Sequence, residues 1–575
     1  RDLYRVDWTP VTTQATEPTA AYTILHAATA AELLPQLQAH LDGEQPLLVH
    51  TRHAATDPDQ SAIRGLARAA QAEHPDRIVL LDTETQDIPD LIPAGEPELA
   101  HEGGEFRAPR LARETATGTT PWPTTGTTLI TGGTGGLGAL TARHLVTTHG
   151  VRSLLLTSRR GTHAPGATEL ATELKELGAE NVMVEACDVG DREAVARLLE
   201  THPDIAAVVH TAGVLDDSTV EHLTGESLAR VWAPKVDAAR HLDELTAGRG
   251  LEAFVLYSST AATFDGTGQA NYAAANAYLD ALAARRQAQG LPGVSLAWGL
   301  WSPEVGGMGA GLSAADVERV ARTGPRALGR EAGLALLDAA LGSGRAHLLP
   351  VPFDTGALER RARDGGLPAI LRGLVRVPGA RRRGAAAEAR GAEALKETLL
   401  RLPAAERTPY VLRLVRARVA AVLGHASGDA VDPERGFGGL GFDSLAAVEL
   451  RNQLSPLTGL RLPATLTFDY PTSQALAEYV REQLVPDETG PAALRAVESE
   501  LAALEAKLVG AVGTEGLDPA DHARVAQTLR GLASRWSELH SAGGGSDTPA
   551  DSLADADAEQ IFDILDGEFE GIDID

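Results

Sequence analysis

A strict alternation of short apolar runs and helical stretches between residues 127 and about 376 constrains the fold more than any other feature of the chain. The stretches between the runs have helical periodicity, and parallel strands need such crossover connections. The alternation therefore predicts an α/β fold with a doubly wound parallel sheet. We expect the strands to be "TLIT", "SLLLTS", "VMVEACD", "AAVVHTAG", "AFVLYSS" and "VSLAWG".

The remaining parts of the 575-residue chain fall into separate units, and this length suggests roughly three or four domains. Residues 1–120 have two apolar runs around a helical stretch but no glycine fingerprint, so we expect a small α/β unit that binds no nucleotide. Residues 121–376 hold the alternating pattern, and residues 377–394 form a basic Ala/Gly linker. Residues 395–485 are expected to form a small helical bundle, and residues 490–575 further helices.

Composition excludes several classes of protein. A formal net charge of -28 argues against a nucleic-acid binder, and no apolar run approaches the roughly 20 residues of a membrane span. The single cysteine, Cys187, excludes a disulfide framework and is typical of a reducing cytosol, so a cytoplasmic location is expected.

Cys/His metal spacing is absent, and we predict no metal. The start, "RDLYRVDW", has no initiator Met or signal segment, which suggests a piece of a longer polypeptide.

The segment "TTLITGGTGGLG" (127–138) is a strand that runs into a glycine cluster and then into a helix. Its T-G-x-x-x-G-x-G spacing places Gly132, Gly136 and Gly138 where the backbone is able to approach a pyrophosphate. The helix N-terminus that follows offers free N–H groups and a positive dipole end. A glycine cluster is also found in ordinary turns, but the flanking strand and helix favour a dinucleotide site.

The end of the next strand indicates which dinucleotide is bound. A NAD site usually has an acidic residue there for the ribose 2′-OH, whereas this chain has Ser158, Arg159 and Arg160. Arg159 is able to pair with a 2′-phosphate, which favours NADPH; the alternative is a solvated basic loop. Asp188 ends the following strand and is placed to reach the adenine. The candidate cofactor-binding residues are Gly132, Thr134, Gly135, Gly136, Leu137, Gly138, Ser158, Arg159, Asp188, Val189, Ala212 and Gly213.

A tyrosine and an asparagine stand out in the alanine-rich helix "ANYAAANAY". Tyr272 and Asn276 are four residues apart and therefore share a helix face, and Ser259 ends the preceding strand on the side where open sheets bind ligands. Tyrosine is able to donate a proton to a carbonyl oxygen as hydride reaches the carbon, but its ordinary pKa of roughly 10 calls for a nearby cation. The alanines between them are expected to leave room for a substrate.

These residues resemble those of the short-chain dehydrogenase/reductase superfamily, and within it the ketoreductase domains of modular type I polyketide synthases. The superfamily usually has Y-x-x-x-K, whereas Asn276 stands in the fourth position here, as it does in the ketoreductases. Their lysine lies in a segment similar to "VWAPKVDAARHL", which makes Lys235 its counterpart. The resemblance implies four catalytic roles. Tyr272 donates the proton, Ser259 hydrogen-bonds the β-carbonyl, Lys235 supplies the cation and Asn276 holds the relay geometry.

The resemblance covers nearly the whole chain and implies a two-part, Rossmann-like ketoreductase. Residues 1–120 would be its structural subdomain, a truncated nucleotide-binding fold that braces the catalytic subdomain, residues 121–376. The short connector 115–126 stands where an enoylreductase would otherwise lie, so none is expected here. The segment "GGMGAGLS" (306–313) is similar to the start of a lid over the substrate.

A triplet after the fourth strand of the alternation bears on stereochemistry. In the ketoreductases an LDD triplet, here Leu215, Asp216 and Asp217, marks B-type enzymes, which give the D-configured (3R) hydroxyl. Phe264 stands where A-type enzymes have tryptophan, and Ala274 in place of proline indicates the subtype that leaves the α-substituent unepimerised. The alternative is that "LDDST" serves as a helix cap.

The segment "GGLGFDSLAAVELRNQL" resembles an acyl carrier protein, and residues 395–485 would form that domain. In that family the serine of the D-S-L triplet, here Ser444, is esterified with 4′-phosphopantetheine. A D-S pair before an amphipathic helix is also an ordinary N-cap. The thiol arm would bring a β-ketoacyl thioester to the reductase, because tethering raises its effective concentration.

Residues 490–575 resemble a C-terminal dimerisation and docking region. Apolar residues recur every three or four positions in "PAALRAVESELAALEAKLVGAV", which predicts a homodimeric helical bundle. The acidic, amphipathic "AEQIFDILDGEFEGIDID" would bind a basic N-terminal docking helix of the next synthase subunit, although a disordered acidic tail is the alternative. Ketosynthase and acyltransferase domains are expected upstream in the same polypeptide.

The expected function is NADPH-dependent reduction of a carrier-bound β-ketoacyl thioester to the β-hydroxyacyl thioester. One alternative is a free-standing reductase of a small ketone, against which Ser444 argues. The other is a carrier and docking scaffold with an inactive reductase. The complete set of Lys235, Ser259, Tyr272 and Asn276 argues against that second alternative.

Overall fold

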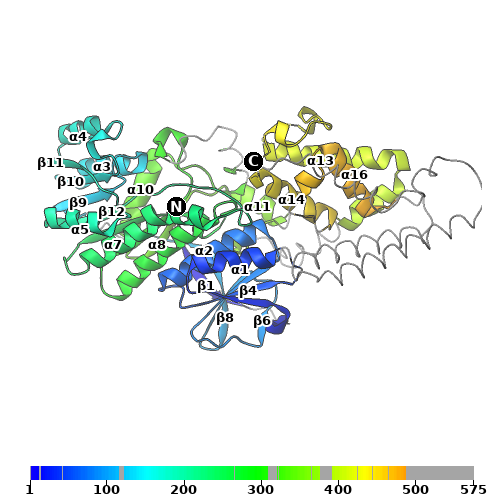
Figure 1. Ribbon diagram of the computed structural model, residues 1–575, viewed down its shortest axis with the longest axis horizontal. Coiled ribbons are helices and arrows are strands. Elements are labelled where there is room, and N and C mark those ends of the chain that lie inside the picture. Colours follow the sequence, from blue (N-terminus) through cyan, green and yellow to red (C-terminus); the bar gives the residue numbers. More distant parts are fainter. Residues whose placement is uncertain are drawn as a thin grey trace, which may run out of the picture. The chain divides into compact units, whose positions relative to one another are not determined.

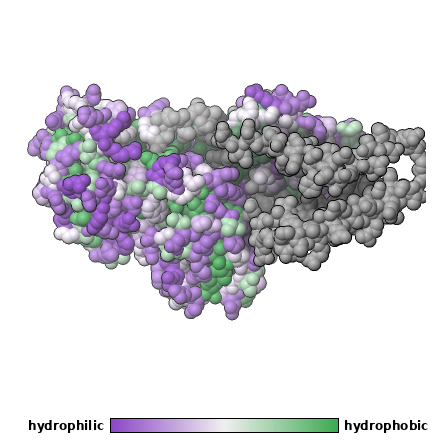
Figure 2. All heavy atoms as spheres, in the orientation of Figure 1, coloured by the Kyte–Doolittle hydropathy of each residue, from purple (hydrophilic) through white to green (hydrophobic). Residues whose placement is uncertain are grey.

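The structure is a computed structural model. It describes residues 2–486 except 12–14, 42, 44, 116–121, 265, 308–316, 318–319, 322, 364–365, 376–391, 424, 426, 443, 461 and 464. The expected dimerisation and docking helices, and most of the expected linker, therefore lie outside the described residues. None of the described helices has the length and apolarity that crossing a membrane requires. Figure 2 shows mainly hydrophilic side chains on the coloured surface, with smaller apolar areas between them.

Among the residues that the structure describes, a seven-stranded parallel array forms the centre of the expected catalytic subdomain and confirms the predicted doubly wound sheet. Its strands are β9 (Thr127–Thr131), β10 (Ser153–Ser158), β11 (Asn181–Ala186), β12 (Ile205–His210), β13 (Ala253–Ser259), β14 (Val294–Trp298) and β15 (His347–Pro350). They lie in the order β11-β10-β9-β12-β13-β14-β15, and each neighbouring pair is parallel. The chain runs outward from β9 to β11 and then returns to the other side of β9. The ends of β9 and β12 therefore form a topological switch point, where open α/β sheets usually bind ligands.

Helices connect these strands and cover both faces of the sheet (Figure 1). The connecting helices are α3 (Gly136–His149), α4 (Ala167–Glu176), α5 (Arg192–Thr201), α6 (Gly225–Trp232), α7 (Ala238–Thr246), α8 (Ala270–Ala288) and α10 (Arg330–Leu341). A further helix, α11 (Thr355–Arg363), follows the last strand. Cys187 is buried beside β11, as expected for a small core residue, and burial raises the pKa of its thiol to about 11.

The expected small α/β unit is present, but its sheet continues that of the expected catalytic subdomain. Its elements are β1 (Leu3–Pro10), β2 (Thr16–Pro18), β3 (Thr23–His26), α1 (Ala30–Leu41), β4 (Leu47–Arg52), α2 (Pro58–Glu73), β5 (Ile78–Thr83), β6 (Leu91–Pro93), β7 (Glu98–Glu102) and β8 (Glu105–Arg113). Strand β1 pairs antiparallel with β15 on one side and with β8 on the other. Among the described residues thirteen strands thus form one sheet, because β1 covers an edge of β15 that would otherwise be unpaired.

Close packing of α2 against α8 explains the alanine-rich sequence of α8. A Cβ atom on Gly65 of α2 would lie 2.5 Å from the carbonyl oxygen of Ala273 and 2.7 Å from Cβ of Ala277. Ala273, Ala274 and Ala275 have no exposed surface. The expectation that the alanines leave room for a substrate is therefore wrong for Ala273, because a small residue there, like Ala277 after Asn276, lets α2 approach α8.

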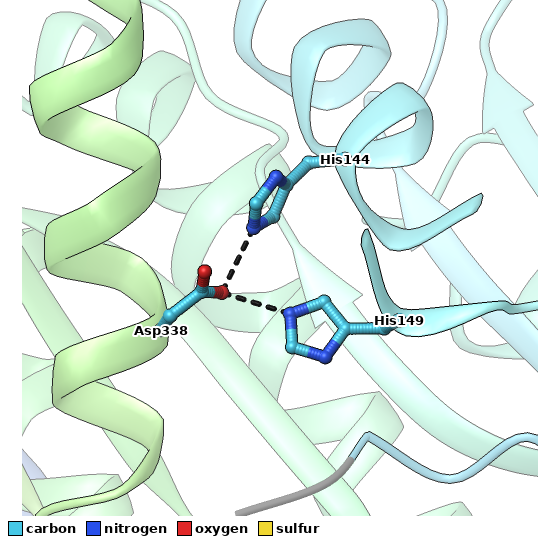
Figure 3. Close-up of side chains that lie close together, drawn as sticks. All are labelled: His144, His149 and Asp338. Carbon is cyan, nitrogen blue, oxygen red and sulfur yellow. Dashed lines mark hydrogen bonds and ion pairs between the residues drawn. The ribbon is translucent and has the colours of Figure 1, made fainter. Parts of the chain in front are cut away.

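Hydrogen bonds from two histidines of α3 to one carboxylate of α10 join these helices (Figure 3). Nε2 of His144 and Nε2 of His149 each lie 2.8 Å from Oδ1 of Asp338. Burial acts to raise the pKa of Asp338, but the hydrogen bonds from both imidazoles outweigh it and the net pKa is lowered. Their potential metal-ligand atoms lie within 4.8 Å of one another, a grouping that spacing along the sequence does not reveal. Both Nε2 atoms are already engaged by the carboxylate, so we interpret the cluster as a structural contact.

The expected carrier bundle contains α13 (Ala404–Leu423), α14 (Ser444–Thr458), α15 (Leu466–Asp469) and α16 (Ser473–Leu484). Its core brings together Val415 and Val419 of α13, Leu450 and Leu454 of α14, and Leu476 of α16. These side chains recur at helical spacing, and each helix buries its apolar face against the others. Residues 392–394, which we assigned to the linker, are helical.

Candidate active site

The glycine loop lies at the switch point of the sheet, between β9 and α3. Gly132 has a φ of 66°, a conformation that glycine adopts without strain. A Cβ on Gly132 would lie 3.0 Å from Cα of Ala212, and one on Gly138 would lie 2.4 Å from the carbonyl oxygen of Gly132. The loop therefore turns sharply and runs directly beside residues 211–212, which follow β12, as the pattern predicts for a cofactor loop.

The residues at this loop fit a dinucleotide phosphate. No side chain among the described residues caps α3, whose N-cap is Gly135, so the first N–H groups of the helix remain available to an anion. Oγ of Ser158, at the end of β10, is a buried atom without a hydrogen-bond partner in the described part of the chain. An unpaired buried hydroxyl is costly, and a bound ligand would satisfy it.

The other candidate cofactor residues lie along the same edge of the sheet. Arg159 is exposed and lies directly after β10. Asp188 lies two residues beyond the end of β11, rather than on the strand as expected, and its Oδ1 accepts a hydrogen bond from the N–H of Gly190 at 3.0 Å. Val189 is buried, and Thr134, Leu137 and Gly213 are half-buried.

Ser259, Tyr272 and Asn276 meet beside the end of β13. Burial raises the pKa of Tyr272 to about 12, and hydrogen bonds with the side chains of Asn276 and Ser259 oppose this rise. Nδ2 of Asn276 donates to the carbonyl oxygen of Tyr272 at 2.7 Å. Oδ1 of Asn276 is buried and has no partner among the described residues, so it is available to a further donor. The phenol is thus protonated at neutral pH, but burial outweighs any lowering of its pKa, so the lowered pKa expected from a nearby cation is not observed.

Lys235 comes to the same place from a separate part of the chain. It lies in a π-helical segment, Ala233–Asp237, between α6 and α7, and is 2% exposed. Its Nζ lies 5.1 Å from the centre of the Tyr272 ring and donates to the carbonyl oxygen of Tyr257 at 3.1 Å. Burial lowers the pKa of Lys235 to about 8, an effect that the negative charge of Asp280 partly offsets.

His210, at the end of β12, is a supporting residue to which the sequence analysis gave no role. Its Nε2 lies 2.9 Å from the carbonyl oxygen of Lys235, and its Nδ1 lies 2.7 Å from Oγ1 of Thr131. Nε2–H must therefore donate to the carbonyl, and Nδ1 accepts from the threonine. Burial, reinforced by the nearby Lys235 charge, lowers the pKa of His210 to about 3, which keeps it neutral. The sequence feature that could have indicated this role is the position of His210 directly before the "TAG" turn.

The Leu215–Asp217 triplet lies against the N-terminus of α8. Asn271 donates its side-chain N–H to the carbonyl oxygen of Asp216 at 2.8 Å, and Gln269 donates to Oδ2 of Asp217 at 2.9 Å. Leu215 is 39% exposed. The triplet therefore contacts the start of α8 directly and presents a leucine to solvent.

Two further expected features lie in different environments. Phe264 is 7% exposed and packs against Phe353, with ring centres 5.8 Å apart, so it belongs to the core. Gly306 and Gly307, at the start of the expected lid, have φ values of 87° and 81°. A Cβ on Gly136 would lie 2.4 Å from the N atom of Gly307, so this segment crosses the cofactor loop; residues 308–313 lie outside the described residues.

Ser444, the candidate attachment residue, is the first residue of α14. Its neighbour Asp443 lies outside the described residues. Further along α14, Val448, Leu450 and Leu454 are buried, as the amphipathic pattern predicts.

Three family models match the chain in the order that the sequence suggests. Residues 3–111 match "Polyketide synthase extender module SpnB, Rossmann fold domain", and residues 126–303 match the KR domain. Residues 413–480, which include Ser444, match "Phosphopantetheine attachment site".

Curated relatives are far longer than this chain. Polyketide synthase GfsA of Streptomyces halstedii is 45% identical over 535 residues, which cover 92% of this chain and 7% of that protein. Spectinabilin polyketide synthase system protein NorA′ of Streptomyces orinoci is 48% identical over 472 residues, which cover 78% of this chain and 13% of that protein. The chain thus spans a small part of each relative.

Among solved structures, the ketoreductase PlmKR1, from the first module of phoslactomycin biosynthesis in Streptomyces sp. HK803, is 32% identical with a TM-score of 0.58. The match covers 65% of this chain and 99% of that one. The first ketoreductase of the tylosin polyketide synthase is also 32% identical, with a TM-score of 0.53, over 66% of this chain and 98% of that one.

Proposed function

Because this chain belongs to the ketoreductases of modular polyketide synthases, we propose that it reduces a carrier-bound β-ketoacyl thioester to the β-hydroxyacyl thioester with NADPH as reductant. The observation that carries the proposal is the convergence of Lys235, Ser259, Tyr272 and Asn276 at the end of the sheet that holds the glycine loop.

The proposed mechanism assigns one task to each side chain. Ser259 donates a hydrogen bond to the β-carbonyl oxygen and polarises it, and Tyr272 transfers its phenolic proton to that oxygen as negative charge develops. Lys235, held by the carbonyl oxygen of Tyr257, places a positive charge near the ring that becomes a phenolate. His210 holds the Lys235 backbone, and Asn276 orients Tyr272 through its carbonyl oxygen.

NADPH, when bound, supplies the hydride. The uncapped N-terminus of α3 and the glycine loop would hold its pyrophosphate, and Ser158 and Arg159 its 2′-phosphate. When attached to Ser444, 4′-phosphopantetheine supplies the thiol that carries the substrate.

We assign the B-type outcome, a (3R) hydroxyl, to the Leu215–Asp217 triplet. Similarity of the whole fold does not distinguish A-type from B-type enzymes. One structural relative, 32% identical with a TM-score of 0.56, is described as an A1-type ketoreductase. The triplet's direct contacts with Gln269 and Asn271 support the assignment, because they place it beside the helix that carries Tyr272. We also propose that residues 490–575 hold two copies of the chain together as a homodimer and bind the following synthase subunit.

A chiral product assay tests the proposed function. The intact chain, NADPH and a racemic α-methyl-β-ketoacyl thioester of N-acetylcysteamine are expected to give mainly one diastereomer, with a (3R) hydroxyl. A (3S) product would contradict the B-type assignment alone. Absence of NADPH oxidation would instead favour the alternative of a carrier scaffold with an inactive reductase.

The predicted role of Arg159 in cofactor choice has a separate test. The Arg159→Ser change is expected to raise KM for NADPH by about tenfold or more while KM for NADH changes little, because one charge-assisted hydrogen bond is lost. Steady-state kinetics with both cofactors measure this. Arg152→Ser is the matched control, because Arg152 is also exposed but precedes β10 and pairs with Glu180 at 2.7 Å. Equal effects of both changes would make Arg159 an ordinary surface residue.

A further inference from the structure

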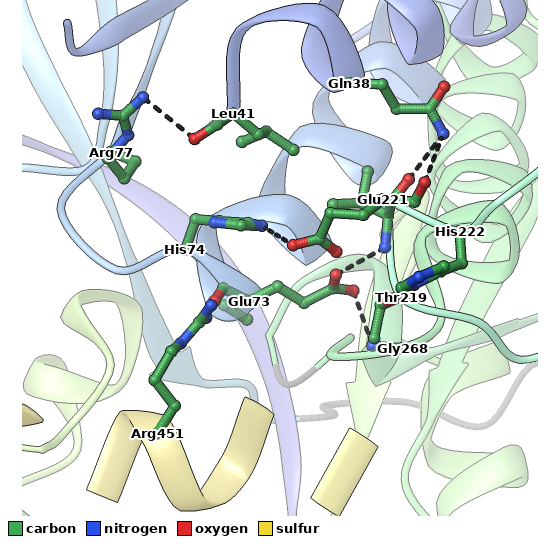
Figure 4. A network of polar contacts seen from close by, with 12 residues as sticks. Gln38, Leu41, Glu73, His74, Arg77, Thr219, Glu221, His222, Gly268 and Arg451 are labelled. Carbon is green, nitrogen blue, oxygen red and sulfur yellow. Dashed lines mark hydrogen bonds and ion pairs between the residues drawn. The ribbon is translucent and has the colours of Figure 1, made fainter. Parts of the chain in front are cut away.

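Glu73, the last residue of α2, carries a carboxylate from the structural half into the catalytic half (Figure 4). It has no exposed surface. Its Oε2 accepts the N–H of Val220 at 2.7 Å, and its Oε1 accepts the N–H of Gly268 at 2.9 Å. One side chain thus ties together two loops that are distant in the sequence.

Both loops lead to the proposed reaction centre. Val220 follows the Leu215–Asp217 triplet, and Gly268 precedes α8, which carries Tyr272. The loops also bind each other, because the N–H of Ser218 donates to the carbonyl oxygen of Gly268 at 2.8 Å. Glu73 accordingly binds the two loops at the place where the segment after the triplet meets the segment before α8.

A charge at this position is costly to the fold. Burial raises the pKa of Glu73 to about 7, against the opposing effect of the two N–H donors. A buried carboxylate destabilises a protein unless hydrogen bonds compensate, and here each oxygen receives one from a different loop. A second tie comes from α1, where Nε2 of Gln38 donates to the carbonyl oxygens of Val220 at 2.9 Å and Leu223 at 2.8 Å.

We propose that Glu73 is a positioning residue for facial selectivity. By holding Val220 and Gly268 at a set separation, it sets the position of the Leu215–Asp217 triplet relative to Tyr272. That position determines the side from which the thioester reaches the phenol. The proposal rests on the proposed function and gives the structural half a part in the stereochemical outcome.

The test is Glu73→Gln in the intact chain. A glutamine keeps the shape and one acceptor oxygen, but its NH2 group faces an N–H donor, so one loop is released. Amide hydrogen exchange in peptides covering residues 214–222 and 266–271 is expected to become about tenfold faster. With the racemic α-methyl-β-ketoacyl thioester, the ratio of major to minor diastereomer is expected to fall about tenfold, with a smaller change in KM for NADPH.

Glu96→Gln is the matched control, because Glu96 is also buried in the structural half but pairs with Arg110 of that half at 2.6 Å. It is expected to leave both the loop exchange rates and the product ratio as in the wild type. Should Glu73→Gln fail to fold, Gln38→Leu loosens the same loop from a less buried position. A shift of the product ratio in that variant supports the proposal, and an unchanged ratio overturns it.

The outcomes separate this proposal from the proposed function. Unchanged exchange in Glu73→Gln overturns the positioning role whatever the enzyme does, because that measurement needs no turnover. Faster exchange with an unchanged product ratio also overturns it. A wild-type (3S) product contradicts the B-type assignment, while a changed ratio in Glu73→Gln still supports the role of Glu73.

Discussion

Replacing Tyr272 by phenylalanine is expected to lower NADPH oxidation on a β-ketothioester by at least about 10²- to 10⁴-fold, because the reaction loses its proton donor. NADPH binding is expected to persist, because the phenol oxygen is the single atom removed and the glycine loop is untouched. Turnover measured by NADPH absorbance and binding measured by cofactor fluorescence together check this result.

Tyr278→Phe provides the control for Tyr272→Phe. Tyr278 is another buried tyrosine on α8, 3% exposed, but it packs edge-on against Trp232 rather than beside Lys235. Its loss is expected to leave kcat within a few-fold of the wild type. Turnover by Tyr272→Phe at the wild-type rate would show that Tyr272 is not the proton donor. Another group would then have to be the acid.

Ser444→Ala is expected to abolish the attachment of 4′-phosphopantetheine, because the hydroxyl that forms the phosphodiester is missing. After incubation with coenzyme A and a phosphopantetheinyl transferase, intact-protein mass spectrometry should show one added group in the wild type and none in the variant. Reduction of a carrier-loaded substrate should then be lost completely, whereas reduction of a free thioester should be unaffected, since Ser444 is outside the reductase.

The matched variant for Ser444 is Ser455→Ala, which removes a serine hydroxyl from the same helix, α14. Modification is expected to remain complete in it. An unmodified wild type, or modification that persists in Ser444→Ala, would be incompatible with the carrier assignment. Because free-thioester reduction is measured in the same samples, failure of the carrier is distinguishable from failure of the reductase.

Local patterns in the sequence were sufficient for the parts of the site that lie within one element. The glycine loop follows directly from a strand, a turn and a helix, and Tyr272 and Asn276 share a face because helical periodicity is local. The doubly wound sheet follows from alternation, since parallel strands require crossovers. Lys235 was found by resemblance to a family, because no local rule singles out a lysine on a helical segment.

The sequence by itself determined the strands, the cofactor loop, the face of α8 that carries Tyr272 and the amphipathic helices of the carrier, because each depends on neighbouring residues. Tertiary structure alone decided the pairing of β1 with β15, the approach of Gly65 to Ala273, the support of Lys235 by His210, and the bridge from Glu73 to two distant loops. These contacts join residues far apart in the chain, so they depend on how whole elements pack. The sequence does not distinguish Glu73 from other glutamates at helix ends, because its two hydrogen-bond donors belong to loops that are distant in the chain.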